Sequence, residues 1–325
     1  MLIGHRRLWD FLTTSAQKGK LAHAYLFCGP PEIGKRTLAW EFSQWLLCQK
    51  PKAKENFSCG QCPSCQKVAK NQHPDLLWLQ PRTEEKRGAV KTLDIGIGEI
   101  KNLQHQLSLT PYSADYKIAL VDGVERLTNQ ALNSFLKTLE EPPRRSLIFL
   151  IAADWRGLLP TIISRCQLIK FLPVPEKKIE AALKGKARSQ EQLHQIVKLA
   201  SGRPGRAIKL LATTELIVQH QQNAATFQKI SKKDLIFRFE LAKELASDNA
   251  AAQEFLDQWA LWLRDGLLTA NGLNDLTVNQ SFVITSSLSS EAAAKSIAAI
   301  EQTKRLLNNT SFNAKLALEI LMLKI

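Results

Sequence analysis

The chain has 325 residues, 45% hydrophobic and 23% charged, which excludes a wholly disordered protein and predicts two to three domains. Lysine and arginine total 44 against 30 acidic residues, and the net charge of +14 favours a polyanionic partner such as nucleic acid. The longest apolar run, 147–153, is far below the roughly 20 residues of a membrane helix, and the N-terminus has no signal-peptide core. We therefore expect a cytoplasmic protein.

The positive charge is unevenly distributed along the chain. Residues 1–172 carry 24 basic and 15 acidic side chains, and residues 173–215 carry nine and four. The remaining 110 residues carry eleven of each. This division predicts that the first two thirds face phosphate groups and that the last third contacts protein.

Short apolar runs alternate with helical patterns through the first 172 residues. The predicted strands are short, mostly apolar runs that lie at 24–28, 76–79, 118–122, 147–152 and 167–171. The predicted helices lie at 8–18, 35–48, 97–108 and 129–140. Apolar strands separated by helices indicate a parallel sheet covered on both faces. Residues 82–94 are charged and unpatterned, so we predict a loop there.

Three domains follow from these patterns. We expect an α/β domain over 1–172, a small helical domain over 173–218 and a wholly helical domain over 219–325. Within the second domain, the sequence SGRPGR at 201–206 predicts a break between helices. The predicted fold class is therefore α/β followed by all-α.

Four of the six cysteines cluster in an insertion at 48–65. They are Cys48, Cys59, Cys62 and Cys65. Four thiolates at this spacing favour a structural Zn²⁺ site with no open position for a substrate. An iron–sulfur cluster is an alternative, although Val68 stands where a ferredoxin run has its next cysteine, and the absence of any metal is another. His73 would be a substitute ligand only if Cys48 were not one.

The sequence AYLFCGPPEIGKRT predicts a strand, a loop and the start of a helix. Gly29, Gly34 and Lys35 satisfy the G-x4-G-K part of a phosphate-binding loop. Arg36 stands where a serine or threonine would hold Mg²⁺, and a guanidinium cannot ligate a metal. Thr37 is rotated by about 100° around the helix and cannot simply take over that task.

The strand that would carry the acidic residues of this site is also altered, at the position after its terminal aspartate. The strand at 118–122 ends in Asp122, which is suited to orienting a metal-bound water. The next residue is Gly123 rather than a water-activating glutamate, and Glu125 lies two residues further along. These losses argue against ATP hydrolysis. They favour a loop kept for packing, with nucleotide binding without hydrolysis as the alternative.

Two segments carry a family resemblance. DGVERLTNQALNSFLKTLEEPP at 122–143 and LLPTIISRC at 158–166 resemble the clamp-loader AAA+ proteins, and the cysteine insertion resembles their bacterial branch in DNA polymerase III. The resemblance implies a P-loop AAA+ module with a small helical lid, followed by a helical collar that forms oligomers. The altered nucleotide site favours a non-motor subunit over the related gamma/tau motor subunit.

The resemblance also assigns roles to individual residues. It implies that Arg165 is an arginine finger acting on the ATP of a neighbouring subunit, against the alternative of an ordinary surface arginine. Arg206 matches the sensor-2 position of the lid. Ala152 and Ala153 stand where a polar sensor-1 residue is expected, which is a third departure from an active motor.

The function implied by the resemblance is that of a stator in the replicative clamp loader, with no polymerase chemistry of its own. Its expected partners are the gamma/tau and delta subunits, the sliding clamp and primed DNA. One alternative is an active ATPase of the gamma/tau type. Another is a zinc-dependent DNA-binding protein with a vestigial AAA+ module.

Overall fold

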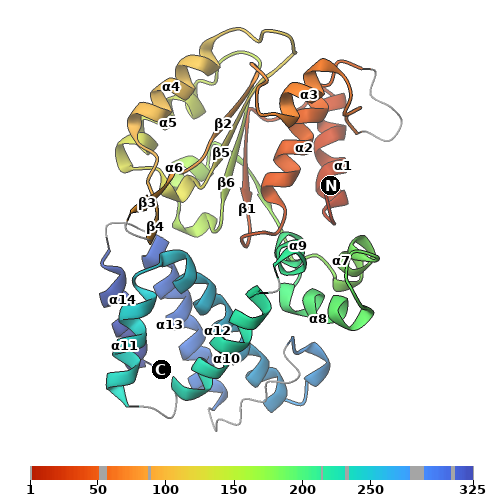
Figure 1. The fold of residues 1–325 in the computed structure, drawn as a ribbon. Coiled ribbons are helices and arrows are strands. Elements are labelled where there is room, and N and C mark those ends of the chain that lie inside the picture. The colour runs from red at the N-terminus through yellow and green to blue at the C-terminus, as the bar shows by residue number, and fades with distance from the viewer. Residues whose placement is uncertain are drawn as a thin grey trace. The chain divides into compact units, whose positions relative to one another are not determined.

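The computed structural model describes residues 2–50, 57–86, 89–213, 215–230, 234–278, 289–308 and 312–324. The chain forms two compact units, whose helices and strands are drawn in Figure 1. Two hydrophobic core clusters lie in unit 1 and one lies in unit 2. Unit 1 comprises Met1–Arg82, Thr92–Ala182 and Gly202–Arg206. Unit 2 comprises Thr83–Lys91, Leu183–Ser201 and Ala207–Ile325.

Unit 1 is built on a five-stranded parallel sheet with the order β2-β5-β6-β1-β7. Its strands are β1 (Ala24–Cys28), β2 (Leu76–Leu79), β5 (Lys117–Asp122), β6 (Ser146–Ala152) and β7 (Gln167–Lys170). The strand β1 lies between β6 and β7, and all five of its residues are buried. The predicted parallel sheet is therefore confirmed, and its three inner strands β1, β5 and β6 are buried on both faces, whereas the edge strands β2 and β7 are partly exposed.

Helices cover both faces of this sheet (Figure 1). The helices α1 (Arg6–Gln17) and α2 (Lys35–Leu47) share one core cluster with alternate β1 residues, including Tyr25 and Phe27. The helices α4 (Ile97–Ser108) and α5 (Asn129–Glu140) share a second cluster with the intervening residues, including Leu26. Because side chains alternate along a strand, one apolar run supplies both cores.

Short elements connect and follow the sheet. They are α3 (Pro63–Ala69), η1 (Val124–Arg126), η2 (Trp155–Gly157), α6 (Pro160–Ile163), α7 (Glu176–Leu183), α8 (Gln190–Ala200) and α9 (Pro204–Ala212). The last three confirm the helical pattern predicted after the sheet. The predicted break at SGRPGR separates α8 from α9.

The prediction of a loop over 82–94 is wrong. Residues Thr83–Lys86 and Ala89–Thr92 form β3 and β4, which pair in a separate two-stranded sheet. The strands escape a search for apolar runs because charged residues interrupt both of them.

The C-terminal part of unit 2 is helical. Its helices are α10 (Glu215–Ile230), α11 (Leu235–Leu245), α12 (Asn249–Ala270), α13 (Ser290–Asn308) and α14 (Ala314–Lys324), with η3 at Asn274–Leu276. Trp259 and Trp262 of α12 lie at the centre of its core. The expected boundary at residue 218 falls within α10. Among the described helices, none combines the length and apolarity needed to cross a membrane.

Candidate functional site

The phosphate loop joins β1 to α2 at the carboxyl end of an inner strand of the sheet. At Gly29, where φ is 154°, an added Cβ would lie 2.7 Å from the carbonyl oxygen of Phe171, so the backbone approach requires glycine. Gly34 has a φ of 110° and caps α2 in the left-handed region, which also favours glycine. The predicted strand, loop and helix are therefore present with their two glycines in constrained positions.

The ammonium group of Lys35 is directed at the loop itself. Its Nζ donates hydrogen bonds to the carbonyl oxygens of Gly29 and Pro30, the latter at 2.8 Å. The residue is 7% exposed, and this burial lowers the pKa of Lys35 to about 8 in spite of the nearby carboxyl groups of Glu125 and Asp122. The lysine that would reach a bound phosphate is thus engaged by the protein.

Two further segments hold the loop from outside. The backbone N–H of Gly205, in the first turn of α9, donates to the Glu32 carbonyl at 2.8 Å, and a Cβ on Gly205 would lie 2.7 Å from that oxygen. Near the N-terminus, Nε2 of His5 lies 2.9 Å from the Ile33 carbonyl oxygen. The loop is therefore packed between the N-terminal segment and the start of α9.

Arg36 lies beside the acidic end of β5. Its guanidinium carbon is 4.0 Å from the centre of the Trp78 ring, and its Nη1 is 3.9 Å from Oδ2 of Asp122. A cationic side chain thus faces the carboxylate that would orient a metal-bound water. Thr37 follows on α2 and is half-buried.

Glu125 reaches back into the site, which the sequence did not reveal. After Asp122 the chain turns through Gly123, where φ is 74°, and Glu125 then accepts a hydrogen bond on Oε1 from the backbone N–H of Ala153 at 3.2 Å. Burial raises the pKa values of both Asp122 and Glu125. Glycine at position 123 was the available signal in the sequence, since glycine readily adopts the positive φ that turns the chain here.

The two positions compared with sensor residues lie near this site. Ala152 is the last residue of β6, and the N–H of Ala153 is the donor to Glu125. Arg206 is 7% exposed and directly follows Gly205, which is bonded to the phosphate loop. The structure therefore brings Lys35, Arg36, Asp122 and the start of α9 to one end of the sheet.

Arg165 follows α6 at the surface, where its side chain is 33% exposed. Its Nη2 lies 2.6 Å from Oε1 of Glu140, at the end of α5. Its Nη1 donates to the Thr161 carbonyl at 2.9 Å and to Oγ of Ser164 at 3.2 Å. The guanidinium is thus oriented by neighbours on α5 and α6 while remaining open to solvent.

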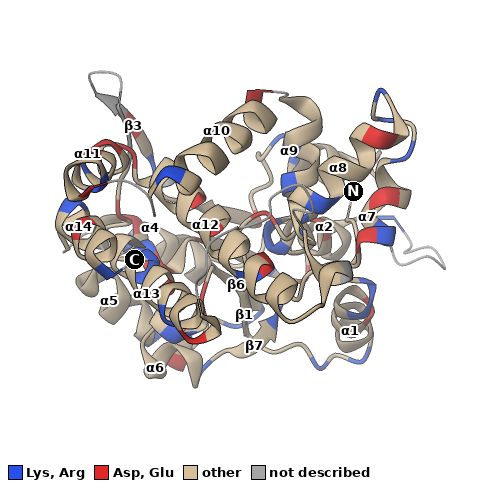
Figure 2. Cartoon of the chain, turned by 90° about the horizontal axis from the view of Figure 1, so that it is seen from below, with Lys and Arg blue, Asp and Glu red and all other residues tan. Residues whose placement is uncertain are grey.

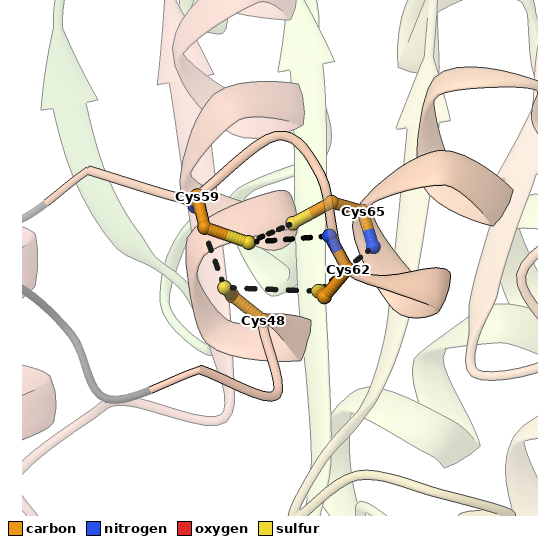
Figure 3. Close-up of side chains that lie close together, drawn as sticks. All are labelled: Cys48, Cys59, Cys62 and Cys65. Atoms are coloured by element: carbon orange, nitrogen blue, oxygen red, sulfur yellow. Dashed lines mark hydrogen bonds between the residues drawn. The ribbon is translucent and has the colours of Figure 1, made fainter.

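The four cysteines of the insertion converge as predicted (Figure 3). Their sulfur atoms all lie within 4.8 Å of one another, with Cys48 to Cys62 at 4.0 Å and Cys59 to Cys65 at 3.9 Å. A Zn–S bond of about 2.3 Å places tetrahedral sulfurs about 3.8 Å apart. The free thiols therefore fit a tetrahedral metal ion of the zinc type.

Backbone donors surround the sulfurs. The N–H groups of Cys59, Cys62 and Cys65 point at the Sγ atoms of Cys48, Cys59 and Cys62, at 3.5, 3.3 and 3.4 Å respectively. Burial opposes ionisation of Cys62, but backbone hydrogen bonds from Cys65 and Gln49 and hydrogen bonds with neighbouring cysteines lower the pKa of its thiol to about 6. Backbone hydrogen bonds also lower the pKa of the Cys59 thiol, whereas burial raises that of Cys65, and a tetrahedral metal would take all four as thiolate ligands.

His73 lies behind the cluster and outside its ligand set. Its Nδ1 accepts a hydrogen bond from the backbone N–H of Asp75 at 3.1 Å, and its Nε2 lies 2.8 Å from Oγ of Ser64. Burial lowers the pKa of His73, which keeps the ring neutral. The Cys48 sulfur lies with the other three, so four candidate ligands come together without His73.

Comparison with known proteins identifies the family. The family model for "DNA polymerase III, delta subunit" matches residues 4–175. The chain is 30% identical to DNA polymerase III subunit delta' of Pseudomonas aeruginosa over 329 aligned residues, covering 98% of this chain and 94% of that relative. It is 32% identical to the Escherichia coli subunit delta', covering 62% of this chain and 58% of the relative.

Related subunits and structures are also similar. Subunit tau of Bacillus subtilis is 28% identical over 55% of this chain and 30% of its own length. A solved gamma subunit-related protein of Thermotoga maritima is 21% identical, with a TM-score of 0.45 over 97% of each chain. The chain belongs to the DNA polymerase III subunit delta' family.

Proposed function

We propose that the chain is a non-motor subunit of the replicative clamp loader, which helps to load the sliding clamp on primed DNA. In this role it assembles with gamma/tau and delta subunits and supplies Arg165 to the ATP site of a neighbouring subunit. Membership of the delta' family and the similarity to a tau subunit support such an assembly.

The observation that carries the non-motor role is the pairing of Arg36 with Asp122. The guanidinium lies 3.9 Å from the carboxylate at the position where a motor would coordinate Mg²⁺, and it stacks on Trp78. A motor also needs a polar sensor at Ala152 or Ala153 and a glutamate directly after Asp122, and the sequence has neither. Since phosphoryl transfer depends on the metal and on these groups, the site lacks its hydrolytic parts.

The geometry of Arg165 supports a finger acting in trans. The side chain is partly exposed, and its ion pair with Glu140 is only half-buried. Exposed ion pairs contribute about 0.2–1 kcal/mol, so Arg165 exchanges Glu140 for a phosphate at little cost. A guanidinium then stabilises the negative charge that develops on the transferring group.

We further propose that the cysteine cluster holds a structural Zn²⁺, because four sulfur ligands leave no site for a substrate. The proposed domains are the AAA+ domain over 1–172 with the cysteine insertion, the lid over 173–218 and the collar over 219–325. The excess of basic residues before residue 216 supports contacts with DNA phosphates inside the assembly.

The test is a clamp loader reconstituted from this chain and its gamma/tau and delta partners. Arg165→Ala should leave assembly intact and lower the DNA-stimulated ATPase rate, because one ATP site loses its finger. The control is Arg156→Ala, another exposed arginine that pairs with a nearby carboxylate, Asp154. An ATPase rate that is the same for Arg165→Ala and the wild type would contradict the finger role.

The gamma/tau-type ATPase stays as the second candidate because Lys35 and both glycines of the phosphate loop are present. Hydrolysis of ATP by the purified chain alone, lost in Lys35→Ala, would favour that candidate. An autonomous zinc-dependent DNA-binding protein would instead bind DNA tightly and lose binding when zinc is removed. Against it, acidic segments lie among the basic ones along several helices (Figure 2).

A further inference from the structure

A line of buried polar side chains runs from the cysteine cluster to a surface loop of unit 1. It begins at Ser64, which lies between Cys62 and Cys65 in the first turn of α3 and is 2% exposed. The Oγ of Ser64 donates to the carbonyl of Leu47, the last residue of α2, at 2.6 Å. Ser64 thus joins the segment that carries two of the metal ligands to the end of α2.

The next member is His73, whose tautomer follows from its partners. A backbone N–H can only donate, so Nδ1 of His73 must accept from the Asp75 N–H and carries no proton. The ring proton is therefore on Nε2, which donates to Oγ of Ser64. This leaves the Ser64 hydroxyl proton for the Leu47 carbonyl, so each donor in the line has one acceptor.

Asp75 carries the line to the loop between α4 and β5. It is fully buried, and its two carboxylate oxygens accept from the consecutive backbone N–H groups of Tyr112 and Ser113, at 2.7 and 2.8 Å. The hydroxyl of Ser113 adds a longer contact of 3.4 Å. Hydrogen bonds to a carboxylate are charge-assisted and directional, so they fix the loop backbone.

The loop presents a large side chain to solvent. Tyr112 is 80% exposed and Leu109, three residues earlier, is 50% exposed, although the backbone of Tyr112 is bound to a buried carboxylate. The flanking residues Ala114 and Tyr116 pack against the core, but the side chain of Tyr112 does not. The backbone N–H of Tyr112 is bound to the Asp75 carboxylate, and the backbone N–H of Asp75 is bound to His73.

We propose that metal binding by the four cysteines orders the Tyr112 loop through Ser64, His73 and Asp75. The bound metal fixes α3, Ser64 fixes the ring of His73, and that ring fixes the backbone N–H of Asp75. His73 and Ser64 are thus positioning residues. This coupling requires a metal in the cluster and is independent of the role proposed for Arg165.

The test measures amide hydrogen exchange of the full-length chain, loaded with Zn²⁺ or treated with a chelator. Removing zinc should raise the exchange rates at Tyr112 and Ser113 by roughly tenfold or more, as expected for loss of a charge-assisted hydrogen bond. The Leu120 amide in β5, which lies between β2 and β6 in the sheet, is the internal reference and should change less. Unchanged exchange at Tyr112 and Ser113 in the metal-free chain would overturn the proposal.

Two variants separate the coupling from general loss of structure. In zinc-loaded His73→Leu and Ser64→Ala, exchange at Tyr112 and Ser113 should rise while Leu120 stays protected and the zinc content stays at one ion per chain. Removing zinc from His73→Leu should then add little, because the connection is already broken. His194→Leu, at an exposed position of α8, is the matched control.

These variants also decide the outcome if the chelated wild type unfolds completely. In that case the zinc-loaded proteins carry the test. Wild-type exchange at Tyr112 and Ser113 in both zinc-loaded variants would overturn the proposal. The same holds if both variants lose protection at Leu120 as much as in the loop, since the effect would then be on the fold as a whole.

Discussion

The phosphate loop lies at the N-terminal end of helix α2 and the cysteine cluster at its C-terminal end, and the functional side chains of the two motifs have different contacts. At its N-terminal end, Lys35 bonds the phosphate loop and Arg36 faces Asp122, so the charged groups of the motif are engaged by the protein. At its C-terminal end, Cys48 and three other cysteines direct their sulfurs at one another. Spacing identifies both motifs, but only tertiary contacts show which of them has ligand groups directed at one point.

The largest effect is expected at the cysteine end. Removing the metal, or the substitution Cys62→Ser, should lower the free energy of unfolding of unit 1 by on the order of 3 kcal/mol or more, because metal binding free energy contributes to folding. Denaturant unfolding with and without a chelator measures this. Gln61→Ala, at an exposed position between two ligands, is the control. A chelator that leaves the unfolding midpoint unchanged would show that this end of α2 holds no structural metal.

A smaller effect is expected where α9 meets the phosphate loop. Gly205→Ala would place a Cβ 2.7 Å from the Glu32 carbonyl oxygen, so we expect a loss of about 1–3 kcal/mol in the free energy of unfolding. Gly98→Ala is the matched control, since a Cβ there meets nothing within 4 Å and should stabilise α4 by roughly 0.5–1 kcal/mol. Equal stability of the two variants would mean that α9 does not hold the loop.

The smallest effect is expected from replacing Arg36, the cationic residue near the N-terminal end of α2. Arg36→Thr frees Asp122 and restores a hydroxyl at the metal position, so saturable binding of Mg²⁺-ATP should appear where the wild type shows none, with an affinity at least tenfold above the detection limit. Calorimetric titration measures this, with Arg156→Thr as a control for lost surface charge. Affinity unchanged by Arg36→Thr would mean that the pocket is closed by other contacts, such as those of Gly205 and His5.

Much of the fold was predictable because its strands are buried on both faces. The runs at 24–28 and 76–79 are strands with the predicted bounds, and helices at 97–108 and 129–140 also have the predicted bounds. The pairing of β3 with β4 was not predictable from the apolar pattern, since charged residues interrupt both strands in the sequence. Periodicity detects a strand only where apolar residues recur along it.

The parts of the candidate site that lie close together in the sequence were predictable. Local spacing placed the four cysteines together and put Lys35 at the start of α2. The return of Glu125 to the N–H of Ala153 and the link from His73 to the loop at Tyr112 join segments 28 and more residues apart. Such contacts depend on the chain path between strands, which sequence spacing alone does not fix.

The central claim is that the phosphate loop of this chain does not operate as a nucleotide site. Calorimetric titration of the isolated, zinc-loaded chain with Mg²⁺-ATP, combined with an assay of phosphate release, tests it directly. The account predicts no saturable binding and no release of phosphate. Saturable binding with hydrolysis, both lost in Lys35→Ala, would contradict it and identify the chain as a motor.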